Sequence, residues 1–390
     1  MGKSKEMKKY VDISGFNISQ ANRGNAALSY GSISFLEEKQ MLVPEQELVF
    51  FQYYRNPFKA KYLLKQKQRF EINGKVYYLN IIPVWFIEQY LCLNFKVFRS
   101  LFRYGRFLKE VAYEAADYGG DGFSDIYGEK LFYSRLNQTI PFMKIGIPLY
   151  ILPQTIGPFK KKEIENVAHK ILHYAKEVYV RDDRYTKKLK SMGINYEKTR
   201  DLSAYMKPEP WDIRIEKNAI GLNISGLAYS NQFYGLENQF DQYPTLIERI
   251  IELFRSKECT VYLIPHSYDY TEPQRNNDDM VACRSTYEKL QDKKNVVFVD
   301  KDLSAPQVKF LISKMNFFIG TRMHANFAAI YTNTPVFGLA YSYKFVGAFD
   351  ANGLDGIEQT VSINNITDKN IETILTKIEK CYDRYTLNKR

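Results

Sequence analysis

The sequence predicts an α/β protein of two Rossmann-like domains that face each other across a cleft. Short apolar runs alternate with helical segments along both halves of the chain, which is typical of parallel sheets covered by helices. At 390 residues the chain is too long for one ordinary core, so two domains are expected. With 45% hydrophobic and 25% charged residues, it has the composition of a globular, soluble protein.

The first domain is predicted to cover residues 1–207. It opens with a short strand at 10–14, a loop rich in Gly and Asn, and a helix at 29–39. Backbone N–H groups in such a loop can hold an oxygen-rich ligand, and we mark Asn22 as a candidate contact for a hydroxyl-bearing substrate. The pattern predicts further elements of this domain, in chain order: strands at 48–51 and 147–152, a Lys-rich helix at 160–176 and a strand at 177–180.

Polar groups follow two extended stretches of this domain. Gly119 and Gly120 let the backbone approach a ligand closely, and the carboxylates of Asp121 and Asp125 can accept hydrogen bonds from sugar hydroxyls. As an alternative, Asp125 caps the helix that follows it. Arg181 comes directly after the strand at 177–180, where it can meet a substrate anion.

A basic and aromatic insertion is predicted at 55–110. Between its ends we count 12 Lys and Arg against 3 Glu, interleaved with Phe, Tyr and Trp. This mixture suits an anionic membrane surface, while single-stranded nucleic acid is a less favoured partner. As a further alternative, the aromatics fill the first core and the lysines are solvated. The apolar part, 81–95, is shorter than the roughly 20 residues of a membrane span.

The second domain is predicted at 216–368, after a linker near 201–211. The apolar runs at 219–224, 260–264 and 296–299 are read as strands, and 245–256 and 305–313 as helices. We expect the last segment, 369–390, to be a helix that packs back on the first domain. His266 follows the strand at 260–264 directly.

Residues 316–347 have the strongest pattern in the chain. An apolar run stops at Gly320, Arg322 and His324 follow, and a helix of small residues begins at once. Such a strand, turn and helix start lies at the carboxyl edge of an open sheet, where ligands bind. Arg322 suits a carboxylate or phosphate, and His324 can exchange a proton near neutral pH. The next strand, 335–338, leads towards Lys344. The alternative is a buried structural histidine beside a surface arginine.

The sequence gives no sign of a resident metal or a secreted protein. Four cysteines lie far apart without a C-x-x-C pair, which argues against a zinc site or a disulfide framework and indicates a reducing compartment. His169 and His173 have helical i, i+4 spacing but lack the glutamate of a zinc-protease motif. The Lys-rich N-terminus has no apolar segment, so we expect a cytoplasmic protein, with attachment to the inner face of the plasma membrane through 55–110 as an option.

Several motifs in this order resemble the polysaccharide pyruvyl transferase family. They are Gly119-Gly120-Asp121, Gln154-Thr155-Ile156-Gly157-Pro158-Phe159, Val180-Arg181-Asp182, Pro265-His266, Gly320-Thr321-Arg322-Met323-His324-Ala325 and Tyr341-x-x-Lys344. The resemblance spans about 10–350 and implies a GT-B-like fold. It also implies transfer of the enolpyruvyl group of phosphoenolpyruvate onto two hydroxyls of a sugar, which forms a cyclic pyruvate ketal and releases phosphate.

The resemblance also implies residue roles. His324 and Arg322 would be catalytic, and Arg181 and Arg322 would bind the donor. From charge and position we add His266 and Lys344 on the donor side and Asp121, Asp125 and Asn22 on the acceptor side. Tyr185 and Asn25 depart from the family pattern, which commonly has serine and aspartate there.

We expect no cofactor beyond phosphoenolpyruvate as co-substrate. The acceptor is expected to be a galactose-type residue of a lipid-linked precursor of a capsule or exopolysaccharide. Two alternatives remain. One is a GT-B glycosyltransferase that uses a nucleotide sugar, for which the sequence offers no persuasive base or ribose contact. The other is a non-catalytic glycan-binding protein at the membrane.

Overall fold

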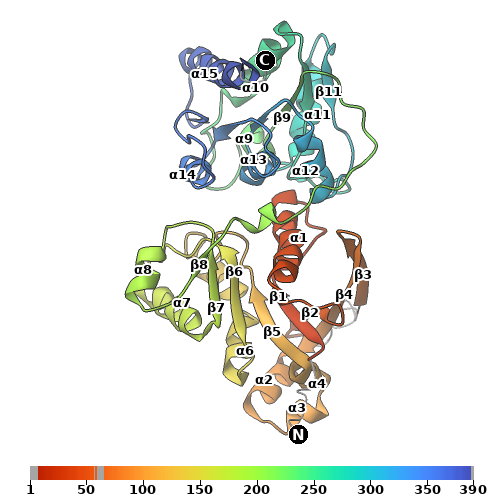
Figure 1. Ribbon diagram of the computed structural model, residues 1–390, viewed down its shortest axis with the longest axis vertical. Coiled ribbons are helices and arrows are strands. Elements are labelled where there is room, and N and C mark those ends of the chain that lie inside the picture. The colour runs from red at the N-terminus through yellow and green to blue at the C-terminus, as the bar shows by residue number, and fades with distance from the viewer. Residues whose placement is uncertain (1–7, 57, 59–65, 388–390) are drawn as a thin grey trace. The chain divides into compact units, whose positions relative to one another are not determined.

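A computed structural model describes residues 8–56, 58 and 66–387 of the chain. It divides into two compact units (Figure 1). The first unit holds the described residues up to Phe16 together with Leu28–Tyr205. The second holds Asn17–Ala27 together with the chain from Met206 onward. The crossing between the units therefore falls within the predicted linker, but residues 17–27, which the sequence places in the first domain, group with the second.

The first unit is built on an eight-stranded sheet. Its strand order is β3-β4-β2-β1-β5-β6-β7-β8, and every neighbouring pair is parallel except β3 with β4. The strands are β1 (Tyr10–Ser14), β2 (Glu47–Tyr54), β3 (Gln66–Ile72), β4 (Lys75–Trp85), β5 (Val111–Ala116), β6 (Leu149–Gln154), β7 (Glu177–Val180) and β8 (Glu197–Lys198).

Helices cover both faces of this sheet. Val178 and Val180 of β7 pack in the cluster that includes α7 and α8, while Tyr179 between them meets Phe35 of α1, with 4.9 Å between ring centres. The helices are α1 (Arg23–Glu38), α2 (Phe86–Asn94), α3 (Phe98–Leu101), α4 (Arg103–Glu110), α5 (Glu129–Arg135), α6 (Thr139–Ile145), α7 (Lys162–Tyr174) and α8 (Thr186–Ser191), with a short 3₁₀ turn at Leu202–Ala204.

The segment predicted as an insertion, 55–110, contributes to the sheet and its core. Residues 57 and 59–65 of this segment lie outside the described residues. β3 and β4 form a hairpin whose turn, Asn73-Gly74, has the positive φ angles that such tight turns favour. Val84 of β4 is buried in one cluster with Tyr104 and Leu108 of α4. Internal packing therefore accounts for part of its aromatic content: Tyr104 is buried, and Phe98, Phe102 and Phe107 are partly buried against the same cluster.

The second unit has a six-stranded, fully parallel sheet with the order β11-β10-β9-β12-β13-β14. Ile220 and Leu222 of β9 pack into one core cluster and Ala219 into another, as alternation along a strand requires. The strands are β9 (Ala219–Asn223), β10 (Thr260–Leu263), β11 (Val296–Phe298), β12 (Phe317–Gly320), β13 (Val336–Ala340) and β14 (Thr360–Ser362). The helices are α9 (Gly226–Ser230), α10 (Tyr243–Ser256), α11 (Asp279–Lys289), α12 (Ala305–Ser313), α13 (Met323–Ile330), α14 (Lys344–Asp350) and α15 (Asp368–Leu387).

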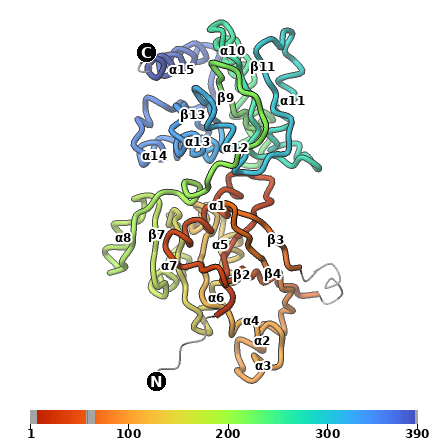
Figure 2. Tube along the Cα trace, turned by 45° about the vertical axis from the view of Figure 1, so that its right-hand side comes forward, coloured from red at the N-terminus to blue at the C-terminus, as the bar shows by residue number. Residues whose placement is uncertain are grey.

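The prediction that the last helix packs back on the first domain is wrong. Ile374 and Ile378 of α15 are buried in the same cluster as Ile250 of α10 and Phe317 of β12. Figures 1 and 2 show α15 beside α10 in the second unit. An apolar stripe on a helix identifies a buried face, but it does not say which core covers that face.

Both sheets have a topological switch point, where the chain order reverses direction across the sheet. In the first unit it lies between β1 and β5, and in the second between β9 and β12. In open α/β sheets ligands bind in the crevice at the carboxyl ends of the strands at such a point. These two positions therefore define where functional side chains are expected.

Candidate active site

Four polar side chains gather at the switch point of the second sheet. Asn223 ends β9, His266 follows β10, and Arg322 follows β12 and immediately precedes α13. Asn223 Oδ1 accepts a hydrogen bond from the Arg322 backbone N–H (2.9 Å), and its Nδ2 donates to the carbonyl of Ile264 (3.0 Å). The fourth is the buried carboxylate of Asp279, the first residue of α11.

Asp279 organises this region. Its Oδ1 accepts hydrogen bonds from Arg322 Nη2 (2.7 Å) and from the Gly226 backbone N–H (2.8 Å). Its Oδ2 accepts from the backbone N–H groups of His266 (3.1 Å) and Ser267 (2.9 Å). One carboxylate thus fixes the loops after β9 and β10 together with the arginine after β12.

Arg322 is held rigidly. Its Nη2 donates to Asn277 Oδ1 (2.7 Å) as well as to Asp279, and Nε donates to Asp279 Oδ1 (3.1 Å). Burial alone would lower the pKa of the guanidinium, but the adjacent Asp279 more than offsets this and raises that pKa. Nη1 forms no hydrogen bond with the described residues and remains available to a ligand.

His266 is buried and uncharged. Burial has the largest effect, and the neighbouring His324, Arg322 and Arg23 add to it; together they hold the pKa of the His266 imidazole well below the usual value of 6.5. Its backbone carbonyl accepts a hydrogen bond from the Arg23 N–H (3.0 Å). A neutral imidazole can donate one hydrogen bond and accept another, but it contributes no charge.

His324 lies in the first turn of α13, as the strand, turn and helix pattern predicts. It is half-buried, and its ring meets Phe327 edge to face with 5.6 Å between ring centres. A Cβ atom at Gly24 would lie 2.7 Å from His324 Nδ1, so only glycine fits there. The first turn of α1, which contains Gly24, therefore encloses one side of the histidine.

The segment 17–27, which includes the first turn of α1, is anchored within the second unit by Arg23. The guanidinium pairs with Asp302 (2.7 Å), donates to the carbonyl of Leu303 (2.7 Å) and lies over the ring of Tyr268. Asn22 Oδ1 accepts from the Gly24 N–H (2.9 Å), and Asn22 bridges to Ser267 through the backbone. The structure thus brings Asn22 to the same strand ends as His266, Arg322 and His324.

Lys344 starts α14, four residues after the end of β13, and is half-exposed. Tyr341, which follows β13 directly, is near enough to Arg322 to contribute to the raised pKa of that guanidinium. The Tyr341-x-x-Lys344 segment therefore belongs to the carboxyl edge of the same sheet.

Arg181 lies in the first unit, after β7, and its charge is already balanced. Nη1 donates to Asp201 (2.5 Å) and Nε donates to Thr155 Oγ1 (2.9 Å). A Cβ at Gly120 would approach Nη1 to 3.0 Å, so the Gly-Gly loop lies directly against the guanidinium. Burial acts to lower the pKa of Arg181, but the Asp201 carboxylate reverses the effect and raises it.

Carboxylates dominate the surroundings of Arg181. Asp117 is buried and accepts from the Gly119 N–H (2.9 Å), and burial raises its pKa to about 6. The Tyr127 hydroxyl donates to Asp121 (2.9 Å). Asp117 is thus used by the backbone of the Gly-Gly loop, and Asp121 is the less buried carboxylate of the two.

Asp125, the other acceptor-side candidate, has one carboxylate oxygen in use and one, Oδ1, without a partner among the described residues. It is buried, and its Oδ2 accepts from the backbone N–H groups of Lys160 (2.7 Å) and Lys161 (2.9 Å), which lead into α7. Its carboxylate therefore binds the backbone just before α7, 35 residues further along the chain. The alternative that Asp125 caps the helix directly after it, α5, does not hold.

Tyr185 occupies the position where the family commonly has serine. Its hydroxyl donates to Glu165 (3.1 Å) and shares a hydrogen bond with His169 Nε2 (2.9 Å), while its ring packs on Phe159. His169 therefore belongs to a structural hydrogen-bond network in the first unit.

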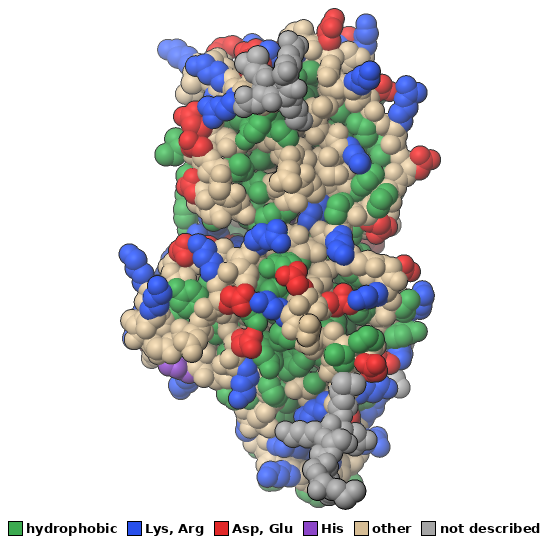
Figure 3. All heavy atoms as spheres, viewed as in Figure 1, with side chains coloured by type: hydrophobic (Ala, Val, Ile, Leu, Met, Phe, Trp, Pro, Cys, Tyr) green, Lys and Arg blue, Asp and Glu red, His purple; other side chains and the backbone are tan. Residues whose placement is uncertain are grey.

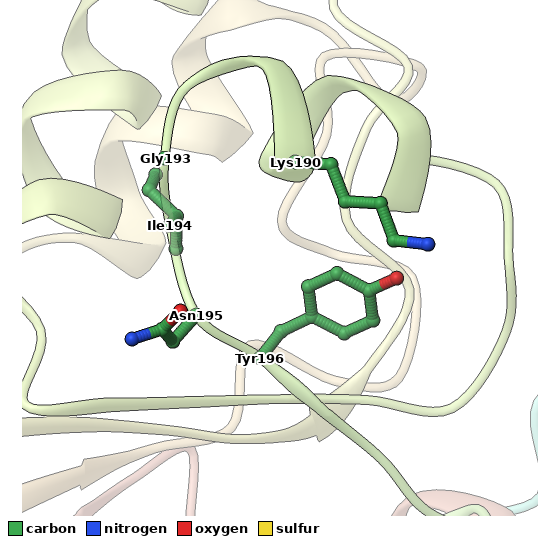
Figure 4. A pocket seen from close by; sticks show the side chains of 5 residues that line it. All are labelled: Lys190, Gly193, Ile194, Asn195 and Tyr196. Carbon is green, nitrogen blue, oxygen red and sulfur yellow. The ribbon is translucent and has the colours of Figure 1, made fainter.

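No group of three or more His, Cys, Asp or Glu side chains is arranged to hold a metal within the described ranges. Likewise, every helix of the described ranges is too short or too polar to cross a bilayer. A hollow of about 460 Å³ is lined by Lys190, Gly193, Ile194, Asn195 and Tyr196. Figure 4 shows these side chains. It contains none of the candidate residues, and we assign it no role.

Sequence reasoning missed Asp279, Asn223 and Asp201. Asp279 stands in an Asn-Asn-Asp-Asp run that opens a helix, and such a run is indistinguishable from an ordinary cap. Asn223 is the only polar side chain in an otherwise apolar strand, a signal that marks a buried functional or structural amide.

Solved structures of similar fold define the class of this protein. A protein from Listeria monocytogenes assigned as a UDP-N-acetylglucosamine 2-epimerase matches with a TM-score of 0.53 at 10% identity, over 97% of this chain and 90% of that one. The UDP-GlcNAc 2-epimerase of Methanocaldococcus jannaschii gives 0.50 at 10% identity, over 95% and 92%. The fold is therefore the two-domain α/β arrangement called GT-B-like, as predicted.

The family follows from sequence comparison. The model of the family described as polysaccharide pyruvyl transferase matches residues 22–343, so the chain belongs to the polysaccharide pyruvyl transferase family. It is also 21% identical over 281 residues to the amylovoran biosynthesis protein AmsJ of Erwinia amylovora. That alignment covers 68% of this chain and 65% of AmsJ.

Proposed function

We propose that this protein transfers the enolpyruvyl group of phosphoenolpyruvate onto two hydroxyls of a sugar in a polysaccharide precursor. The product is a cyclic pyruvate ketal, and phosphate is released. The observation that carries the proposal is the pair formed by Arg322 and His324 on one strand-to-helix turn. Asp279 fixes the arginine there while leaving Nη1 available.

Phosphoenolpyruvate carries a carboxylate and a phosphate, and the second unit offers matching donors. Arg322 Nη1 can donate to either group, and the free N–H groups at the start of α13 favour an anion. Lys344 adds a positive charge at the same sheet edge, and neutral His266 adds one hydrogen bond. Arg181 is assigned to the donor by family resemblance, although its charge is already matched by Asp201.

The chemistry requires proton movement and no metal. A proton adds to the methylene carbon of phosphoenolpyruvate, and one sugar hydroxyl attacks the resulting cationic carbon and loses its own proton. The second hydroxyl then displaces phosphate at that carbon and closes the ring, and its proton leaves with the phosphate. We assign the proton transfer to His324, since histidine can act as acid and base near neutral pH.

We propose that the acceptor is a galactose-type residue of a lipid-linked precursor of a capsule or exopolysaccharide. The transfer would take place in the cytoplasm. Asn22 and Asp121 are our candidates for hydroxyl recognition. The side-chain nitrogen of Asn22 forms no hydrogen bond with the described residues and can donate to a hydroxyl. Asp121 carries acceptor oxygens beside the Gly-Gly loop.

The proposal is tested by incubating the protein with phosphoenolpyruvate and a panel of lipid-linked galactosides. We expect phosphate release that depends on the acceptor, together with a product heavier by one pyruvate ketal. His324→Ala serves as the inactive control. Consumption of a nucleotide sugar, with no phosphate released from phosphoenolpyruvate, would favour the glycosyltransferase alternative.

Ligand stabilisation supplies a second test, which needs no acceptor. At about 100 times its Kd, phosphoenolpyruvate should add about 2.7 kcal/mol to the free energy of unfolding, seen as a higher melting temperature. Activity should persist in EDTA. Stabilisation by nucleoside diphosphates but not by phosphoenolpyruvate would contradict the donor assignment.

A further inference from the structure

Exposed apolar side chains are concentrated in one short stretch of the first unit. Phe86, Ile87 and Tyr90 on α2 fall within an arc of about 100° around the helix axis and are 47%, 37% and 57% exposed. Val97, just before α3, is 65% exposed, and Leu101, the last residue of α3, is 66% exposed. Phe95, in the link between these helices, is also exposed.

The three helices that carry this stretch form one compact layer. Arg99 Nε donates to the carbonyl of Cys92 (2.8 Å), which ties α3 to α2, and Glu88 accepts from the Tyr104 N–H (2.8 Å), which ties α2 to α4. Figure 2 shows α2, α3 and α4 side by side. The exposed apolar groups therefore lie on helices that are tied to one another, a region that we call the α2–α4 surface (residues 86–110).

Basic side chains accompany these groups. Lys96, Arg106 and Lys109 are exposed, and none of the three forms an ion pair with any residue that the structure describes. Glu110 is the exposed acid of the same segment, and the Glu88 carboxylate is used by the backbone of α4. Figure 3 shows Lys and Arg side chains over this end of the first unit.

We propose that the α2–α4 surface docks the protein on an anionic lipid bilayer. Exposed Phe, Tyr, Leu and Val side chains enter the interfacial region of a bilayer, and unpaired cations beside them attract anionic headgroups. An uncompensated positive charge selects this occupant over a second copy of the chain, which would bring like charges together. The proposal concerns location and stands independently of the reaction assigned above.

The experiment measures pelleting of the full chain with phosphatidylcholine vesicles, with and without phosphatidylglycerol. We expect binding that requires the anionic lipid and weakens with salt. Val97→Ser with Leu101→Ser should weaken binding at least tenfold. Lys96→Gln with Arg106→Gln should weaken it about fivefold for each cation lost.

Matched controls come from exposed residues elsewhere. Ile357, in the second unit, is 70% exposed, and Ile357→Ser is the control for the apolar substitutions. Lys170→Gln with Lys187→Gln, which removes two exposed cations of the first unit, is the control for the charge substitutions. These variants should bind like the parent protein, and all variants should keep its melting temperature, because the replaced side chains lie outside the core.

Two results would overturn the proposal. One is pelleting that is absent, or equal for the α2–α4 variants and the controls. The other is a dimer in analytical ultracentrifugation that dissociates in Val97→Ser with Leu101→Ser, which would assign the surface to a second copy of the chain. Neither result bears on phosphate release from phosphoenolpyruvate, so failure here leaves the proposed reaction standing.

Discussion

A pair of buried carboxyl groups makes the stability of the first unit depend on pH. Asp12 of β1 and Glu114 of β5 are direct neighbours in the sheet, and both are fully buried. Glu114 Oε1 accepts hydrogen bonds from Ser14 Oγ (2.5 Å) and Thr139 Oγ1 (2.6 Å), while Oε2 has no partner among the described residues. Burial raises the pKa of Glu114 from 4.5 to about 7, although the two hydroxyls partly oppose the shift. Burial, and then Glu114, also raises the pKa of Asp12.

The direction of the effect follows from where the proton is held. Below pH 4.5 both folded and unfolded chains carry the Glu114 proton, and its contribution to stability is fully present. As the pH rises from 4.5 to about 7, the unfolded chain loses the proton first, so the free energy of unfolding falls. One pKa unit corresponds to about 1.4 kcal/mol, so the fall amounts to about 3 kcal/mol and ends above pH 7.

Glu114→Gln tests this reasoning, because glutamine stays neutral and keeps an acceptor oxygen for Ser14 and Thr139. Urea unfolding is measured at about pH 5 and about pH 8. In a Trp211→Phe background, the fluorescence of Trp85 in β4 reports on the first unit alone. The loss of stability between the two pH values should shrink by about 3 kcal/mol in the variant.

Glu197→Gln is the matched control, since Glu197 is a half-exposed surface carboxylate that pairs with Lys39. It should leave the pH dependence as in the parent protein. If Glu114→Gln also leaves the pH dependence of the free energy of unfolding unchanged, burial does not raise the pKa of Glu114, and the argument fails.

Three further predictions concern the second unit. His324→Ala should lower turnover by about 10²–10⁴-fold while the affinity for phosphoenolpyruvate changes little, and equal losses in both quantities would contradict its role in proton transfer. Arg322→Lys should weaken phosphoenolpyruvate binding more than tenfold, because one ammonium nitrogen cannot replace the separate Nε, Nη1 and Nη2 donors of the planar guanidinium; unchanged affinity by calorimetry would refute this. Asp279→Asn should lower the free energy of unfolding by about 3–5 kcal/mol, because it leaves the buried Arg322 charge unpaired; a loss below about 1 kcal/mol in urea unfolding would show that the pair is not organising the site.

Local pattern was sufficient for the strand ends of the second unit. The apolar run that stops at Gly320 is β12, and Met323, between Arg322 and His324, begins α13. His266 follows β10 within three residues, as predicted. Periodicity and a helix start are local properties, so one sequence carries them, and parallel topology then places the strand ends together.

Long-range partners explain what the sequence did not predict. Arg23 pairs with Asp302, 279 residues away, and this contact draws residues 17–27 into the second unit. The sequence analysis did not predict β4, and Pro83 within it is unusual for a strand that has a neighbour on each side. In the structure Pro83 lies beyond Ile81, the last β4 residue paired with β3 in the described part of the chain, so its missing N–H costs no bond on that side.

The charges at the carboxyl edge of the sheet in the second unit bear on how that site could recognise an anion such as phosphoenolpyruvate. Asp279 neutralises Arg322, Asp302 neutralises Arg23, and burial keeps His266 uncharged. The site therefore does not rely on a large fixed excess of positive charge, which would attract any anion. It offers instead donors at fixed positions: one guanidinium nitrogen, one imidazole and the first turn of α13. Fixed donors discriminate by geometry, because a ligand must place its carboxylate and phosphate oxygens where the N–H groups already point. In the reaction that we propose, a rigid arginine held by a buried carboxylate is thus better suited to orienting phosphoenolpyruvate for attack at one carbon than to capturing it at long range.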